Sequence, residues 1–259
     1  MTTSFDCSDP NARSAGLAAA QQAIANRQCI VLPTDTVYGI GADAFSPQAV
    51  ATLLAAKGRG RSMPPPVLVP RLQTMDGLAV DVSAEARALA EAFWPGGLTL
   101  IFHAQPSLTW DLGDTRGTVA LRMPDDEIAL DLLALTGPMA VSSANRTGQA
   151  AAQTAAQAQA QLAESVEVYL EAGPRPAEGS EGIPSTIVDA TDFPLRVVRD
   201  GAVSLEELRA VVPTVLGLGE EPAPAQDTPA EEAPADGPAG SADEEAAEEA
   251  ADTAAPRQS

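Results

Sequence analysis

Apolar residues along the chain recur either at helical spacing or in short unbroken runs. Between residues 11 and 26, Leu17, Ala20 and Ile24 lie at helical spacing, which predicts an amphipathic helix. The run at residues 29–32 is short, apolar and followed by Pro33, which is typical of a buried strand. Further helices are predicted at residues 46–57, 83–93, 126–135, 149–163 and 205–212. Further strands or short apolar runs are predicted at residues 67–69, 98–102, 119–122, 139–141, 166–170, 186–188 and 195–198.

The order of these elements indicates the fold class. Ser46 and Pro47 suit the N-cap and the first position of the helix at residues 46–57. Residues 34–41 are rich in hydroxyls and glycine, and we expect them to form a turn. Helices and strands alternate in the first half of the chain, and strands cluster later. This order favours an α/β fold, with a mixed, twisted sheet and flanking helices.

Composition changes sharply after Leu216. Residues 217–259 contain 12 of the 36 acidic residues and one of the 15 basic residues, in a sequence rich in alanine and proline. Such a segment buries too little apolar area to offset the entropy cost of ordering it. We therefore expect a folded domain at residues 1–216 and a disordered acidic tail at residues 217–259.

Charge and cysteine content limit the binding partners and the cellular compartment that we expect for the protein. The formal charge of −21 argues against general attraction to nucleic acid or to anionic membranes. Cys7 and Cys29 have no metal-binding or redox spacing, so we expect reduced thiols. The N-terminus lacks the pattern of a signal peptide, and no run of 18 apolar residues occurs. These features predict a cytoplasmic protein without a membrane span.

The densest group of positive charges is Lys57-Gly58-Arg59-Gly60-Arg61, which contains the only lysine of the chain. Lysine is a compact point charge and arginine a bidentate fork, while glycines let backbone N–H groups approach an anion. The group therefore suits a polyphosphate, although a solvated basic loop after a helix explains it equally well. It is not a P-loop, because the chain contains no G-x-x-x-x-G-K-[ST] segment.

Polar side chains gather where several predicted strands begin or end. Four segments share this position: residues 33–39, 142–145, 182–186 and 199–201. Each segment alone also fits an ordinary turn or helix cap. Their shared position favours one site for a small polar ligand.

Two common kinds of catalytic site are not expected. The single histidine, His103, has no H-x-x-E-H type partner for a metal site. A Ser-His-Asp triad on a nucleophile elbow would need a G-x-S-x-G segment, which the chain lacks. The acidic residues 125–127 are best explained as a helix start, where carboxylates are favourable.

Seven segments in this order resemble the YrdC/TsaC family of L-threonylcarbamoyladenylate synthases. They are residues 32–39, 57–59, 93–99, 121–124, 143–145, 184–189 and 199–201. The K-x-R of Lys57 and Arg59, with the distant S-x-N of Ser143 and Asn145, is the signature of that family. The resemblance implies a YrdC-like open, twisted mixed sheet with a large concave cavity. It makes residues 1–216 the catalytic domain.

The resemblance also implies a reaction and its partners. L-threonine, bicarbonate and ATP would give L-threonylcarbamoyladenylate and pyrophosphate. Mg²⁺ would arrive with ATP, without a metal site of the protein. The product would serve N6-threonylcarbamoyladenosine formation in tRNA through a transferase complex (TsaD, TsaB and TsaE).

Residue roles follow from the same resemblance. The catalytic set would be Lys57, Arg59, Ser143 and Asn145. The ATP-binding residues would be this set together with Arg61, Thr118 and Arg199. The threonine-binding residues would be Thr34, Thr36, Arg122 and Ser185, with Arg122 facing the carboxylate. Fixed cations suit this chemistry, because attack on the α-phosphorus gathers negative charge and needs no protein nucleophile.

Some positions depart from the family pattern. Gly60, Met63 and Pro65 stand where many relatives carry Pro, Asn and Leu, and Asp126 stands in place of a frequent His. An asparagine contact to the nucleotide is therefore lost at Met63 or taken over by Arg61.

An RNA-binding module on the same fold is an alternative function, but aromatic residues are only 3% of the chain, too few for extensive base stacking. A related adenylating or carbamoyl-transfer enzyme is a third reading.

Overall fold

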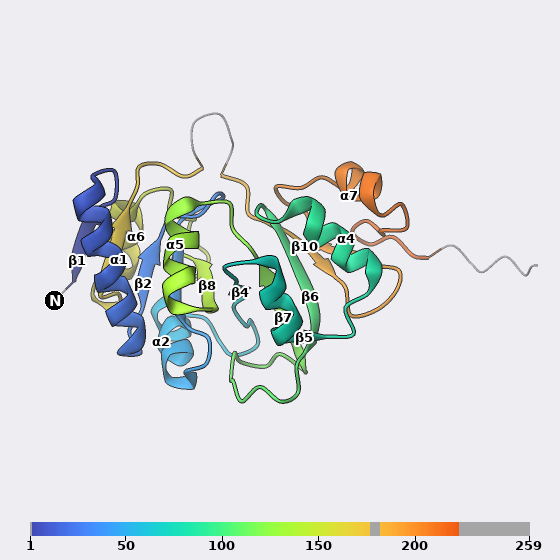
Figure 1. The fold of residues 1–259 in the computed structure, drawn as a ribbon, viewed down its shortest axis with the longest axis horizontal. Coiled ribbons are helices and arrows are strands. Elements are labelled where there is room, and N and C mark those ends of the chain that lie inside the picture. Colours follow the sequence, from blue (N-terminus) through green and yellow to red (C-terminus); the bar gives the residue numbers. More distant parts are fainter. Residues whose placement is uncertain (1, 177–181, 223–259) are drawn as a thin grey trace, which may run out of the picture. The chain divides into compact units, whose positions relative to one another are not determined.

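Residues 2–176 and 182–222 are described by the computed structural model of the protein (Figure 1). The helices are α1 (Pro10–Ala25), α2 (Pro47–Lys57), α3 (Met75–Leu78), α4 (Ala84–Phe93), α5 (Glu127–Thr136), α6 (Ala155–Leu162) and α7 (Leu205–Val211), with 3₁₀ turns at Leu72–Thr74 and Ala163–Ser165. The strands are β1 (Thr3–Asp6), β2 (Ile30–Leu32), β3 (Gly39–Asp43), β4 (Val67–Leu68), β5 (Ala79–Val80), β6 (Leu98–Ala104), β7 (Thr118–Arg122), β8 (Met139–Ser143), β9 (Val168–Glu171), β10 (Thr186–Asp189) and β11 (Arg196–Arg199).

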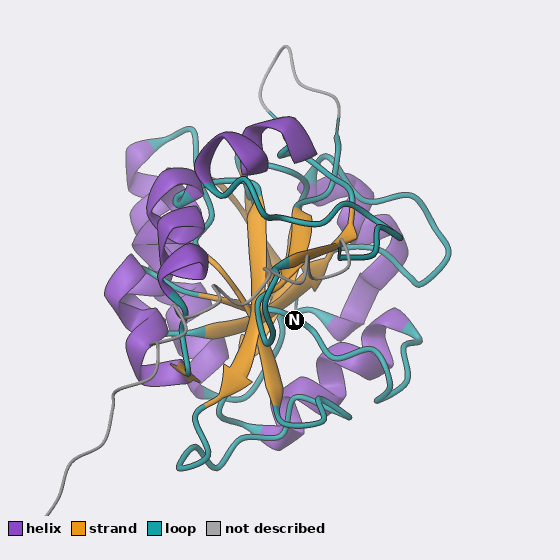
Figure 2. Cartoon of the chain, turned by 90° about the vertical axis from the view of Figure 1, so that its right-hand side faces the viewer, coloured by secondary structure: helices purple, strands orange, loops and turns teal. Residues whose placement is uncertain are grey.

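The strands of the described residues form one mixed sheet. Its order is β1-β9-β2-β3-β8-β4-β7-β6-β10-β11, and β5 pairs with β6. The pairs β1/β9, β2/β9, β4/β7 and β6/β10 are parallel, and the other pairs are antiparallel. Figure 2 shows helices on both sides of the strands. This arrangement confirms the expected α/β fold.

Side chains that alternate along the central strands form two apolar layers. Val31 packs in one cluster with residues of α2, α4 and α6, while its neighbours Ile30 and Leu32 pack in the other with α1 and α5. Val67 and Leu68 divide in the same way. Because successive side chains of a strand point to opposite faces, a continuous apolar run such as residues 30–32 fits a strand covered on both sides.

The second helix begins and ends as its sequence predicts. The Ser46 hydroxyl accepts a hydrogen bond from the Ala49 N–H at 3.3 Å, and Pro47 occupies the first turn. Gly58 ends the helix in a left-handed conformation (φ +63°), which glycine adopts without steric cost. Lys57 is therefore the last helical residue, and Arg59 leaves the helix in a new direction.

Several expectations about local structure were wrong. The turn expected at residues 34–41 ends earlier, because Gly39 and Gly41 pair with Leu32 and Ile30 in an antiparallel ladder. A Cβ at either glycine would lie 2.6 Å from a side chain of β8, so close packing explains why this strand contains glycine. The helix expected from residue 149 begins at Ala155, because Thr154 caps it. Strands β1 and β5 and helix α3 were not predicted.

The start of the predicted tail takes part in the fold. Described contacts continue past Leu216: the Glu220 carboxylate accepts a hydrogen bond from the Gly217 N–H at 2.9 Å and also contacts the Arg209 guanidinium. The compact unit ends at Pro222. The rest of the predicted tail, residues 223–259, lies outside the described residues.

Within the described chain, no helix has both the length and the apolar character needed to cross a membrane.

Gly201 offers a test of the packing that holds the last strands. A Cβ at this residue would lie 2.3 Å from the Pro184 carbonyl oxygen and 2.5 Å from the Ser185 carbonyl carbon, so alanine forces two backbone segments apart. We expect Gly201→Ala to lower the free energy of unfolding by about 1–3 kcal/mol, measured by urea denaturation. Gly77→Ala in α3 is the control, because no atom of the described residues lies within 4 Å of its added Cβ. Equal stabilities of the two variants would contradict this packing.

Candidate active site

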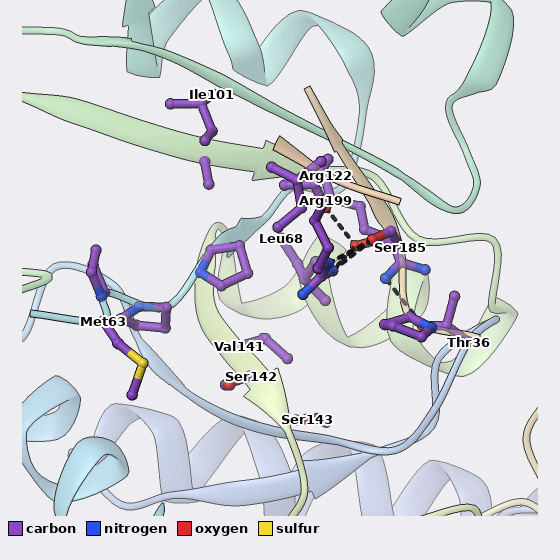
Figure 3. Close-up of a pocket in the computed structure, with 18 of the residues that line it drawn as sticks. Thr36, Met63, Leu68, Ile101, Arg122, Val141, Ser142, Ser143, Ser185 and Arg199 are labelled. Atoms are coloured by element: carbon purple, nitrogen blue, oxygen red, sulfur yellow. Dashed lines mark hydrogen bonds between the residues drawn. The ribbon is translucent and has the colours of Figure 1, made fainter. Parts of the chain in front are cut away.

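A cavity of about 360 Å³ lies where the predicted polar segments meet (Figure 3). Three arginines from distant parts of the chain line it: Arg59 after α2, Arg122 at the end of β7 and Arg199 at the end of β11. Its polar lining otherwise consists largely of hydroxyls, from Thr34, Thr36, Thr99, Thr115, Thr118, Ser142, Ser143 and Ser185. Among the described residues that line it, none carries a carboxylate. The cavity therefore suits a small anionic ligand.

Arg122 is held in place by three acceptors. Its Nη2 donates to the Asp35 carboxylate at 2.7 Å, its Nη1 to the Thr36 hydroxyl at 3.1 Å, and its Nε to the Gly96 carbonyl at 2.9 Å. The Asp35 carboxylate also accepts from the Asp125 N–H at 3.0 Å. A guanidinium has five N–H donors, so Nη1 and Nη2 each keep one N–H for a ligand. That pair suits the two oxygens of a carboxylate.

Arg199 and Ser185 form a second polar unit. The Arg199 guanidinium donates to the Ser185 carbonyl through Nη2 at 2.6 Å and through Nε at 3.1 Å, and Nη2 also reaches the Ser185 hydroxyl at 3.0 Å. The Ser185 hydroxyl lies 2.8 Å from the Thr99 hydroxyl. Burial of the guanidinium, with the positive charges of Arg122 and Arg59, lowers the pKa of Arg199. An anion in the cavity would relieve this repulsion.

Arg59 presents an incomplete set of hydrogen bonds. Its Nη1 donates to the Ser142 hydroxyl at 3.1 Å, and its buried Nε has no partner among the residues that the structure describes. Burial lowers the pKa of Arg59. A buried donor without a partner costs about 1–3 kcal/mol, so a ligand oxygen at this atom would be stabilising.

Lys57 lies behind the cavity wall. Its side chain is 1% exposed, and its Nζ donates to the carbonyl oxygens of Ser143 and, at 2.7 Å, Asn145. Burial, with a smaller contribution from the nearby Arg59 charge, lowers the pKa of Lys57 to about 8. The Asn145 amide donates to the carbonyls of Arg146 and Gln149, while its buried Oδ1 meets no donor in the described part of the chain. Lys57 therefore fixes the turn that presents Ser143 to the cavity.

Comparison with known proteins identifies the family. The family model Sua5/YciO/YrdC, described as telomere recombination, matches residues 22–201. A Mycobacterium tuberculosis protein with the provisional name of threonylcarbamoyl-AMP synthase is 53% identical over 212 residues, 82% of this chain and 96% of that protein.

The chain belongs to the Sua5/YciO/YrdC family.

Two further matches come from Pyrococcus abyssi. Its threonylcarbamoyl-AMP synthase is 34% identical over 184 residues, 71% of this chain and 53% of that protein. A solved structure of Sua5 from that organism, complexed with L-threonine, has a TM-score of 0.72 and 32% identity over 78% of this chain and 58% of that one. The chain thus spans little more than half the length of these archaeal relatives, and the likeness supports the YrdC fold.

The structure brings most of the expected site residues of this family member together. Eight of them line the cavity: Thr34, Thr36, Arg59, Thr118, Arg122, Ser143, Ser185 and Arg199. Lys57 and Asn145 stand behind Ser143, and Arg61 does not line the cavity. Its guanidinium instead pairs with Asp111 at 2.8 Å. The ligand that each of these residues binds stays a prediction.

Sequence reasoning did not select several residues of the site. Asp35 orients Arg122, and Ser142 accepts from Arg59; both lie inside segments that were selected, so their position was the available signal. Thr99 and Thr115 also line the cavity. His103 lies on the exposed side of β6, with its Nε2 3.1 Å from the Thr191 carbonyl oxygen. In the described part of the chain, no three metal-ligating side chains gather.

The buried amine of Lys57 predicts a pH dependence of stability. Below about pH 8 the folded protein bears the full cost of burying the charge, and that cost disappears as pH rises toward the ordinary pKa of 10.5. Wild-type stability should therefore rise relative to Lys57→Met by up to roughly 3 kcal/mol between pH 8 and 10.5, measured by urea denaturation. Cysteine and tyrosine titrations are common to both proteins. A difference that does not change with pH would contradict the lowered pKa.

Proposed function

We propose that the protein is an L-threonylcarbamoyladenylate synthase, a nucleotidyltransferase that joins L-threonine, bicarbonate and ATP and releases pyrophosphate. The observation that carries the proposal is the concentration of three guanidinium groups around one small cavity, with the Arg59 Nε unpaired. The volume of about 360 Å³ falls within the range of small-ligand sites. The names of the bacterial and archaeal relatives support the same activity.

In this proposal the nucleotide phosphates lie between Arg59 and Arg199. Both side chains line the cavity, and the hydroxyls of Ser142 and Ser143 lie on the same wall as the Arg59 contact. Negative charge grows on the α-phosphate when the carbamate oxygen attacks it, and fixed guanidinium groups stabilise that charge without reorganising. No protein nucleophile is required.

Threonine occupies the end of the cavity formed by Thr36, Arg122 and Ser185, which lie close together in Figure 3. The two unused N–H groups on Nη1 and Nη2 of Arg122 donate hydrogen bonds to the carboxylate of threonine. The amine of threonine then faces the nucleotide, where it attacks the carbon of bicarbonate to form a carbamate and release water. Holding the carbamate beside the phosphate removes most of the entropy cost of their meeting. The threonine bound to the archaeal relative supports this choice of substrate.

Mg²⁺ enters with ATP in this proposal. Mg²⁺ prefers oxygen ligands and keeps several of its waters, so phosphate oxygens hold it readily. The described lining offers it hydroxyl oxygens, from Ser142 and Ser143 among others, and no carboxylate. Bound there, the ion would offset charge on the phosphates.

The product implies further partners. A mixed anhydride of this kind hydrolyses readily, so a cytoplasmic tRNA threonylcarbamoyl transferase complex (TsaD, TsaB and TsaE) would consume it.

The alternative function, an RNA-binding module, has less support. The cavity arginines serve an enclosed small-molecule site, and the chain as a whole is strongly acidic. Any direct RNA contact would therefore be weak.

Pyrophosphate release tests the proposal. The protein with ATP and Mg²⁺ should release pyrophosphate only when threonine and bicarbonate are both present. Arg122→Lys should raise the KM for threonine roughly ten-fold or more and change the KM for ATP much less, because lysine cannot offer a planar pair of donors.

Arg87→Lys is the matched control. Arg87 forms an exposed ion pair with Asp76 at 2.6 Å and does not line the cavity. Its kinetic constants should equal those of the wild type. Pyrophosphate release without threonine would rule out the proposed reaction, whereas an unchanged threonine KM in Arg122→Lys would remove only the role of Arg122.

A further inference from the structure

One wall of the cavity is a long loop between β6 and β7, residues 105–117, called the wall loop below. It supplies Leu112 and Thr115 to the lining, and Thr118 follows at the start of β7. Met63 and the following prolines also line the cavity, and the wall loop contacts this segment just before Met63, where the Asp114 N–H donates to the Arg61 carbonyl oxygen. In Figure 3, Met63 lies on the far side of the cavity from Thr36. The wall loop thus borders the end of the cavity that is remote from the proposed threonine site.

Arg61 holds this loop through its side chain. Its Nη1 donates to Asp111 Oδ2 at 3.0 Å and its Nη2 to Asp111 Oδ1 at 2.8 Å, a bidentate pair, while its Nε lies 3.5 Å from Asp114 Oδ1. The Arg61 hydrogen bond lowers the pKa of Asp111. Both carboxylates belong to the wall loop. The guanidinium is therefore already occupied by protein carboxylates.

The backbone of Arg61 also contacts the loop. Its carbonyl oxygen accepts the Asp114 N–H at 2.8 Å. A Cβ at Gly113 would lie 2.6 Å from that same oxygen, and Gly113 has a φ of +107°. Only glycine fits such a close approach in this conformation. The contact between the two segments therefore depends on Gly113 as well as on the ion pair.

A third contact lies next to the other two. The rings of Phe45 and Trp110 stack with centroids 5.6 Å apart and an angle of 19° between their planes. Trp110 directly precedes Asp111 in the wall loop. Trp110, Asp111, Gly113 and Asp114 of the loop thus contact Phe45 or Arg61, which lie in the segments that flank α2. The C-terminus of α2 carries Lys57 and leads to Arg59.

We propose that Arg61 is a positioning residue that, with Asp111 and Gly113, holds the wall loop against the segment carrying Arg59 and Met63, and so sets the affinity for the nucleotide. The inference rests on the proposed use of ATP. It replaces the expected contact of Arg61 with ATP. An exposed ion pair contributes little by itself, so the bidentate pair and the close backbone approach act together.

Asp111→Asn separates this role from direct phosphate binding. If Arg61 bound ATP, removing its competing carboxylate would free the guanidinium and lower the KM for ATP. If Arg61 positions the wall loop, Asp111→Asn and Arg61→Ala should each raise the KM for ATP three-fold or more, and the double variant should be no worse than either one. The KM for threonine should stay within two-fold. Asp76→Asn, which breaks the distant pair with Arg87, is the charge-matched control and should have no effect.

Gly113→Ala and Gly117→Ala test the close approach. Both glycines lie in the wall loop with positive φ, but an added Cβ at Gly117 has no described atom within 4 Å. Alanine therefore strains the backbone at both positions and collides with Arg61 at only one. Gly113→Ala should raise the KM for ATP more than Gly117→Ala does. Equal values would overturn the role of Gly113, provided that both variants keep wild-type melting curves.

Limited trypsin digestion measures how firmly the wall loop is held and does not depend on the activity of the enzyme. Arg116 is an exposed cleavage site within the wall loop. Asp111→Asn and Gly113→Ala should accelerate cleavage after Arg116 at least three-fold relative to the wild type, with Asp76→Asn unchanged. Wild-type cleavage rates in both variants would overturn the positioning role. Faster cleavage in a protein without threonine-dependent pyrophosphate release would sustain the loop contacts while refuting the proposed reaction.

Discussion

Positive charge that the protein only partly neutralises is the constraint on which the site depends. Lys57 is buried against carbonyl oxygens, the Nε of Arg59 has no partner within residues 2–176 and 182–222, and the pKa of Arg199 is lowered by burial and by its neighbours. Asp35 is the carboxylate that orients one of the three cavity arginines. The folded chain must hold these cations together at a cost, which an anionic ligand offsets.

The sheet supplies the rigidity that this arrangement needs. Arg122, Arg199 and most of the lining hydroxyls stand at or next to the ends of β2, β7, β8, β10 and β11, strands far apart in sequence that lie in one sheet, while Arg59 follows α2. Backbone contacts complete the support. Lys57 bonds the turn after β8, Arg199 bonds the carbonyl of Ser185, and Gly201 packs against the same segment. Side chains on such elements keep their positions when the ligand is absent.

Local signals in the sequence predicted much of this fold and site. The Ser-Pro start of α2, its end at Lys57 and the polar segments at strand ends depend on neighbouring residues, and the structure confirms them. The strand containing Gly39 was mistaken for a turn, because glycine spacing there reflects packing against β8. The Arg61 guanidinium pairs with Asp111, which is 50 residues away, and no local pattern reveals such a pairing.

The burial of Lys57 has a consequence for the chemical reactivity of the whole protein. It is the only lysine in the sequence, and its Nζ lies inside the fold between two carbonyl oxygens. Reagents and enzymes that acylate or conjugate lysine side chains therefore find their single target only when the turn at residues 143–145 opens. Modification of Lys57 would therefore report on that opening.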